Sequence, residues 1–221
     1  MRISKSFYSI VLLASLILTS CFEDESLSEI KGSGNQITES RVVDSFSAIE
    51  ISSIVNANVV QSNTQALSVT TDDNILPLVK TNVRNGILFV DLEQGSYEDV
   101  DVTVSIALPE IEYLTTDGVN TVNMSNINND NLSITLEGVG DITLSGQTGK
   151  LEINSNGSTN LDGFDLISEI CDISLSGIGN AEVKVVNELS GTLSGVGNIL
   201  YKGEPQINVD VTGVGNIVDA N

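Results

Sequence analysis

Short runs of alternating apolar and polar residues recur along most of the chain. Residues 88–92 and 102–108 are two clear examples, with aliphatic side chains at every second position. A period of two places alternate side chains on opposite faces of a β-strand. Between two such runs, Asn85-Gly86 fits the positive-φ positions of a tight hairpin turn. The pattern predicts an all-β protein with one short helical turn within residues 74–83.

A phrase built on two glycines interrupts the strand pattern repeatedly in the second half of the chain. It reads Gly-Val-Gly-Asn or a close variant, and its clear copies hold Gly138 and Gly140, Gly177 and Gly179, Gly195 and Gly197, and Gly213 and Gly215. A degraded copy at 153–163 aligns with Ser155 in the first position, which gives spacings of 17, 22, 18 and 18 residues. Weaker copies begin at Gly118 and Ser53.

The repeat length predicts how the chain folds. A period near 18–20 residues is typical of a solenoid, in which each turn buries its apolar face against its neighbours. We therefore expect one domain over residues 31–221, a right-handed parallel β-helix or similar solenoid with rungs of about 18–20 residues. Such a rung must turn corners, and glycine there permits a positive φ or a bulge. A ligand site at the phrase is the alternative interpretation.

An asparagine follows the second glycine in three clear copies, as Asn180, Asn198 and Asn216, and the other clear copy carries Asp141. Side-chain amides stacked on successive rungs can hydrogen-bond along the stacking axis. Calcium-binding nonapeptide rolls also repeat every 18 residues, but carboxylate charge is what makes such a site bind calcium. The phrase therefore predicts a structural ladder, and no metal or cofactor is expected.

The residue between the two glycines is aliphatic in every clear copy. By strict alternation Val139, Ile178, Val196 and Val214 lie opposite the core-facing residues, so they would form an exposed apolar ridge. A ridge of this kind is a candidate contact site for a partner or a second copy. The alternative is a bulge at each corner that turns the four side chains inward to pack.

The N-terminus has the pattern of an export signal. Arg2 and Lys5 precede an apolar run at 10–18 that is too short to span a bilayer. The small residues before Cys21 resemble the lipobox of bacterial lipoproteins, in which the cysteine is lipidated, so residues 1–20 are interpreted as a lipoprotein signal peptide. An ordinary signal peptide that contains a cysteine is the alternative. The expected membrane attachment is through this lipid alone.

Residues 21–30 form an acidic tether that contains Glu23, Asp24 and Glu25. An acidic run just after the lipidated cysteine resembles a surface-export signal of some Gram-negative phyla. We therefore expect an outer-membrane lipoprotein exposed at the cell surface, with the periplasmic face as the alternative location. A plain solvated spacer is the alternative interpretation of the tether.

The composition excludes several function classes. The chain has 221 residues, 30 of them acidic and 9 basic, and its net charge of -21 argues against binding to nucleic acid. It has no histidine, which is the commonest general base and metal ligand. With Cys21 assigned to lipid, Cys171 has no disulfide partner, so we expect a small buried hydrophobe there, with a reactive thiol as the alternative.

A glycan-active β-helix enzyme would need two carboxylates that converge in one groove. The candidate groups are Asp72-Asp73 and the stretch Glu98, Asp99 and Asp101. Adjacent residues of a strand point to opposite faces, so neither group forms an obvious pair. The sequence therefore predicts a protein that is not an enzyme.

Several stretches in this order resemble the bacterial family described as "putative auto-transporter adhesin, head GIN domain". They are "GSGN", "FSAIEIS", "DDNILPLVKTNVRNGIL", the repeated "SGVGN" or "SGIGN", and "YKGEPQINVDVTGVGNI", and together they cover residues 31–221. The resemblance implies a secreted or surface β-helix-like domain, often on a lipoprotein, and it transfers no catalytic motif. Asn120 and Ser155 depart from the repeat and make the middle rungs less regular.

The expected function follows from the resemblance and the anchor. We expect a lipid-anchored module of the cell envelope or surface, with a structural or adhesive role and an extracellular protein or glycan as ligand. A carbohydrate-binding or glycan-active β-helix protein is the alternative.

Overall fold

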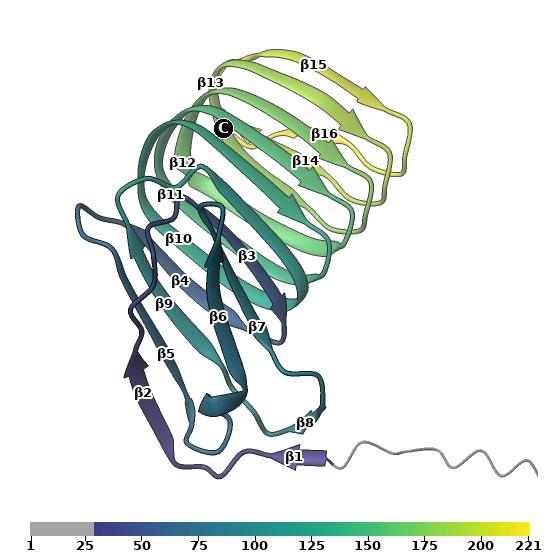
Figure 1. The fold of residues 1–221 in the computed structure, drawn as a ribbon. Coiled ribbons are helices and arrows are strands. Elements are labelled where there is room, and N and C mark those ends of the chain that lie inside the picture. Colours follow the sequence, from purple (N-terminus) through teal and green to yellow (C-terminus); the bar gives the residue numbers. More distant parts are fainter. Residues whose placement is uncertain (1–28) are drawn as a thin grey trace, which may run out of the picture.

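The computed structural model describes residues 29–221 and confirms the expected all-β solenoid, with about five turns (Figure 1). Parallel strands stack along one axis, and the longest of them bend around corners with one register shift in each pairing of β10 with β11 and of β11 with β12. The stacked strands of this part are β10 (Tyr113–Leu136), β11 (Val139–Ser155), β12 (Ser158–Leu175), β13 (Ala181–Leu193), β14 (Ile199–Lys202), β15 (Gln206–Val211) and β16 (Ile217–Asp219). No α-helix occurs within the described range.

The first rungs do not follow chain order. β3 (Ala48–Ser53) and β4 (Asn56–Gln61) pair in parallel with β10 on one side. On their other side they pair with β7 (Ile87–Leu92) and β9 (Thr103–Leu108), which come later in the chain. The chain therefore adds a rung beneath β3 and β4 before it continues upward into β10 (Figure 1).

Antiparallel strands close the N-terminal end of the solenoid. β5 (Ala66–Asp72) pairs with β9 and with β2 (Gln36–Ser40), and β6 (Val79–Arg84) pairs with β7. The predicted hairpin joins β6 to β7, with φ of 52° at Asn85 and 78° at Gly86, and the predicted helical turn is η1 (Leu76–Leu78). A short parallel pair links β1 (Glu29–Lys31) to β8 (Ser96–Glu98).

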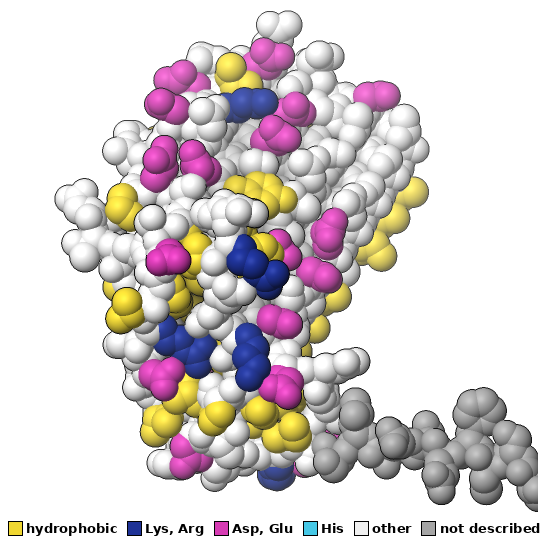
Figure 2. Space-filling model, in the orientation of Figure 1, with side chains coloured by type: hydrophobic (Ala, Val, Ile, Leu, Met, Phe, Trp, Pro, Cys, Tyr) yellow, Lys and Arg dark blue, Asp and Glu magenta, His cyan; other side chains and the backbone are white. Residues whose placement is uncertain are grey.

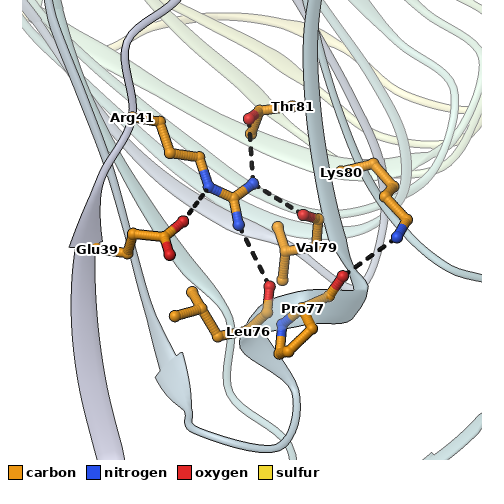
Figure 3. Close-up of polar contacts among 7 residues, drawn as sticks. All are labelled: Glu39, Arg41, Leu76, Pro77, Val79, Lys80 and Thr81. Carbon is orange, nitrogen blue, oxygen red and sulfur yellow. Dashed lines mark hydrogen bonds and ion pairs between the residues drawn. The ribbon is translucent and has the colours of Figure 1, made fainter.

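Arg41 fastens the N-terminal segment to this closed end (Figure 3). Its guanidinium donates to the carbonyl oxygens of Leu76 and Val79 at 3.2 and 2.8 Å, and to the Thr81 hydroxyl at 3.0 Å. It also pairs with Glu39 at 2.9 Å. Because the Arg41 side chain is only 15% exposed, these four partners replace most of its hydration.

The interior is filled by columns of aliphatic side chains, one from each rung. Cys171 lies in such a column, paired in register with Leu151 and Leu189 on the rungs below and above. It is fully buried, and burial raises the pKa of its thiol to about 12. The thiol therefore stays protonated near neutral pH, which confirms its interpretation as a small buried hydrophobe.

The first glycines of the phrase stack directly on one another, and Gly157 takes the place that the sequence alignment gave to Ser155. Ser155 pairs instead with Leu136 and Leu175, so it occupies a core-facing leucine position, where its hydroxyl lies 2.8 Å from that of Thr159. The stacked first positions are Gly118, Gly138, Gly157, Gly177, Gly195 and Gly213. The predicted spacings of 17 and 22 are therefore wrong, and the true ones are 19 and 20 residues.

The backbone hydrogen bonds continue through the glycine corner. The N–H groups of Ile178, Val196 and Val214 donate to the first-glycine carbonyl of the rung below at 2.8–2.9 Å. Rungs this close leave no room for a side chain at the glycines. A Cβ at Gly197, whose φ is 152°, would overlap the carbonyl oxygen of Gly179. At the phrase, the backbone of each rung is therefore stacked directly on that of the rung below.

Two rungs lack the second glycine and form the corner with a different residue. Asn120 and Thr159 stand at this position without a positive φ, and both are buried. The Asn120 amide donates inward to the carbonyl oxygens of Ser53 and Val55 at 3.1 and 2.9 Å. The Thr159 hydroxyl lies 2.8 Å from that of Ser155, so in both rungs the side chain at this position is directed inward to a polar partner.

Substitution of Gly197 by alanine tests the corner. Gly86→Ala is the matched control, because Gly86 also has a positive φ but has open space around its α-carbon. The control should cost roughly 1–2 kcal/mol from backbone strain alone, and Gly197→Ala should cost clearly more because it adds the overlap with Gly179. The free energies of unfolding from denaturant titration measure both. Equal losses would remove the stacking constraint.

Candidate functional site

The residues between the paired glycines lie on the outside of the solenoid. Their exposed fractions are 52% for Val139, 61% for Ile178, 51% for Val196 and 71% for Val214. The last three are bridged in parallel, each to the next, so they form a straight column. Alternation therefore continues through the corner, and the inward-packed arrangement is not the one observed.

The column extends toward the N-terminus beyond the residues that the sequence indicated. Val119 pairs with Val139 and is 57% exposed, and Val139 pairs with Ser158, which interrupts the column before Ile178. Sequence reasoning missed Val119 because the second glycine of its copy is replaced, although Gly118 just before it was a signal. We call Val119, Val139, Ile178, Val196 and Val214 the apolar ridge. Figure 2 shows hydrophobic side chains along the right-hand edge, where in Figure 1 the chain turns from β15 to β16.

The asparagines beside the ridge form the predicted ladder. The backbone N–H of Asn198 donates to Oδ1 of Asn180 at 3.0 Å, and that of Asn216 donates to Oδ1 of Asn198 at 3.1 Å. The N–H of Asn180 donates to Oδ1 of Asn160 at 3.2 Å, and Nδ2 of Asn160 donates to Asp141. Each amide oxygen thus satisfies a backbone donor of the next rung, so these groups stabilise the corner.

A second corner, formed by β10, β11, β12 and β13, carries a polar groove of about 490 Å³. Its lining is amide, carboxylate, hydroxyl and aliphatic, without lysine or arginine: Asn128, Asn129, Asp130, Gln147, Thr148, Gly149, Ile167, Glu169, Val186 and Asn187. Register shifts between β12 and β13 interrupt the stacking beside it. No repeated phrase marks this corner, so sequence reasoning missed it.

Amide groups fix the floor of the groove. Nε2 of Gln147 donates to Oδ1 of Asn128 at 2.8 Å, and the backbone N–H of Asn128 donates to Gln61 at 2.8 Å. Nδ2 of Asn129 donates to the carbonyl of Ile111, while its Oδ1 is buried without a partner. The groove therefore combines positioned polar groups with the exposed aliphatic surfaces of Ile167 and Val186.

The carboxylates considered for catalysis are used to join segments. Asp73 accepts from the Ser33 hydroxyl at 2.6 Å and from Nδ2 of Asn35 at 2.9 Å, and these bonds hold the pKa of Asp73 below its ordinary value. Glu98 and Asp99 both pair with Lys31. Asp101 accepts from Nδ2 of Asn56 at 3.3 Å. In residues 29–221 no group of three or more Cys, Asp or Glu side chains is placed to hold a metal ion.

The model of the family described as "Putative auto-transporter adhesin, head GIN domain" matches residues 45–205. The chain belongs to this family. The predicted resemblance is thereby confirmed, and the family's name points to a protein of the cell surface with an adhesive role. No curated protein sequence matches the chain.

Two solved structures share the fold of this head GIN domain. A putative adhesin from Bacteroides fragilis superposes with a TM-score of 0.69 at 24% identity, over 85% of this chain and 98% of that one. A putative lipid binding protein from Parabacteroides distasonis gives 0.50 at 22%, over 87% and 100%. At these identities the likeness shows the fold. Among residues 29–221, no helix is long and apolar enough to cross a membrane.

Proposed function

We propose that this head GIN protein is a lipid-anchored surface module with an adhesive or structural role and without catalysis, and that the apolar ridge is its contact surface. The observation that carries the proposal is the ridge itself. Five aliphatic side chains, each more than half exposed, lie in a column interrupted by Ser158, on a protein with a net charge of -21. Exposed apolar patches of this order mark interaction sites, and the family's name agrees with such a role.

The proposed anchor, Cys21, and the acidic residues Glu23, Asp24 and Glu25 lie outside the described residues. The described chain begins at Glu29, in β1, at the end of the solenoid remote from β15 and β16 (Figure 1). A lipid on Cys21 would therefore hold the N-terminal end near the membrane and leave the upper rungs and their ridge accessible. The proposed location is the outer membrane with the domain at the cell surface, and the periplasmic face is the alternative.

Carbohydrate binding is a second candidate function, and the groove at the irregular corner favours it. Sugar hydroxyl groups need closely placed donors and acceptors, and their C–H faces need apolar surface. The groove offers such donors and acceptors on Gln147, Asp130, Glu169 and Asn187. Ile167 offers the apolar surface. The two carboxylates and the lack of basic lining favour a neutral glycan over an acidic one.

Replacement of Cys21 by serine tests the anchor. If Cys21 is lipidated, Cys21→Ser should abolish incorporation of a palmitate analogue and release the protein from the membrane fraction. Replacement of Glu23, Asp24 and Glu25 by alanine should leave acylation intact and protect the domain from external protease. Full labelling of the Cys21→Ser variant would refute the anchor, and unchanged proteolysis of the alanine variant would refute the export signal.

The double variant Val196→Ser and Val214→Ser tests the ridge. Both side chains are exposed, so stability should change by no more than about 0.5 kcal/mol per site, while attachment of cells that display the protein should fall severalfold. The matched control is Val42→Ser with Val218→Ser, which removes exposed valines elsewhere. Wild-type attachment at equal surface level, or a loss equal to that of the control, would exclude the ridge as contact surface.

Replacement of Gln147 by alanine and Glu169 by glutamine tests the groove. The probes are dextran, mannan and laminarin as neutral polysaccharides, with alginate as the acidic one. A neutral probe should bind to cells that display the protein, and the double variant should bind about tenfold more weakly, a loss of roughly 1.4 kcal/mol. Gln36→Ala with Glu110→Gln, both exposed and outside the groove, is the control. Preference for alginate, or no effect of the groove variant, would rule this function out.

A further inference from the structure

We infer that the partner of the apolar ridge is a second copy of this chain, and that the two copies meet along the upper rungs, through Ile178, Val196 and Val214. The inference rests on the proposed adhesive function and specifies its partner. Two features of the ridge support it, the charge beside it and its repeat distance, and its small area sets how strong the contact can be.

Charge restricts where two copies can approach. The lower ridge is flanked by Asp117, Glu137 and Asp141. In contrast, the stretches 176–180, 194–198 and 212–216 consist only of Ser or Thr, Gly, an aliphatic residue and Asn. Exposed charges repel within a Debye length of about 8 Å at physiological salt. On two molecules of net charge -21, the upper ridge is therefore a surface where contact brings no acidic side chains of the flanking positions together.

The repeat distance of the ridge matches a second copy. Successive rungs lie about 4.8 Å apart, and each of Ile178, Val196 and Val214 lies between two glycines in the chain, which carry no side chain beside it. The ridge of one copy can therefore lie against the bare backbone strip beside the other ridge. Because both copies have the same spacing, all three contacts form together, as side chains do between stacked sheets.

A two-fold axis gives the contact a defined geometry. In an isologous pair the same patch serves both copies. Val196 lies between Ile178 and Val214 in the column, so it would meet Val196 of the second copy at the axis. Ile178 would then meet Val214 of the second copy.

The contact area predicts a weak but additive interaction. Three aliphatic side chains and the adjoining backbone strip cover far less than the roughly 800 Å² per partner of a stable complex. Single pairs in dilute solution should therefore dissociate readily. Copies held together on one surface raise the effective concentration, so many weak contacts can act at once.

Cysteine cross-linking on intact cells tests this contact in the full chain. In Val196→Cys, mild oxidation with copper phenanthroline should give a reducible dimer, and the buried Cys171 should contribute none. Val139→Cys is the matched control, since its residue has the same exposure, 52% against 51%, but lies on the acid-flanked lower ridge. We expect at least fivefold more dimer from Val196→Cys, and a mixed dimer when Ile178→Cys and Val214→Cys are expressed together with different tags.

Equal cross-linking at Val139 and Val196, or no dimer at either position with normal protein levels, would overturn the inference. The outcomes also separate this contact from the proposed function. If no dimer forms but Val196→Ser with Val214→Ser still reduces attachment, the ridge binds another molecule and the adhesive function stands. If the dimer forms and attachment is unaffected, the self-contact stands and the adhesive function fails.

Discussion

The close stacking of backbone at the glycine corner is the constraint on which the rest of the structure depends. Carbonyl oxygens of one rung accept from the N–H groups of the next throughout the turn, so the rungs cannot separate to admit a Cβ. For that reason glycine holds the first position of the corner in every stacked rung from Gly118 to Gly213. With both flanking positions held by glycine, the residue between them, such as Val196, is directed outward. One steric requirement thus sets the corner and the apolar ridge together.

The glycine corner and the groove suit different kinds of binding partner. At the glycine corner the upper rungs repeat the same geometry, and the ladder through Asn180, Asn198 and Asn216 satisfies their backbone donors. A periodic surface of this kind suits a contact that is weak at each rung and strong in sum. At the other corner, register shifts leave a groove with positioned amides such as Gln147, and a groove suits a discrete ligand.

The N-terminal end of the solenoid needs a cover that the repeating rungs do not provide. A solenoid leaves unpaired strand edges and an open core where it begins. Here the antiparallel strands β2, β5 and β6, with η1 and the half-buried Arg41, cover that end. Because the covering segments pair with β7 and β9, the chain must place this rung beneath β3 and β4. The family's adhesin name thus belongs to a domain whose N-terminal end is closed and whose upper rungs repeat at the glycine corner.

The sequence by itself determined the elements that depend on local chemistry or on repetition. These elements could be predicted because each requires particular residues at a fixed spacing. They are the strand period, the turn at Asn85-Gly86, the helical turn before Val79 and the rung of 18–20 residues. Tertiary structure decided the alignment of Gly157, the order of the first rungs, the groove and the outward direction of the ridge. Each of these depends on which strand stacks on which, and an irregular copy such as 155–159 can be aligned only by the neighbours that pack against it.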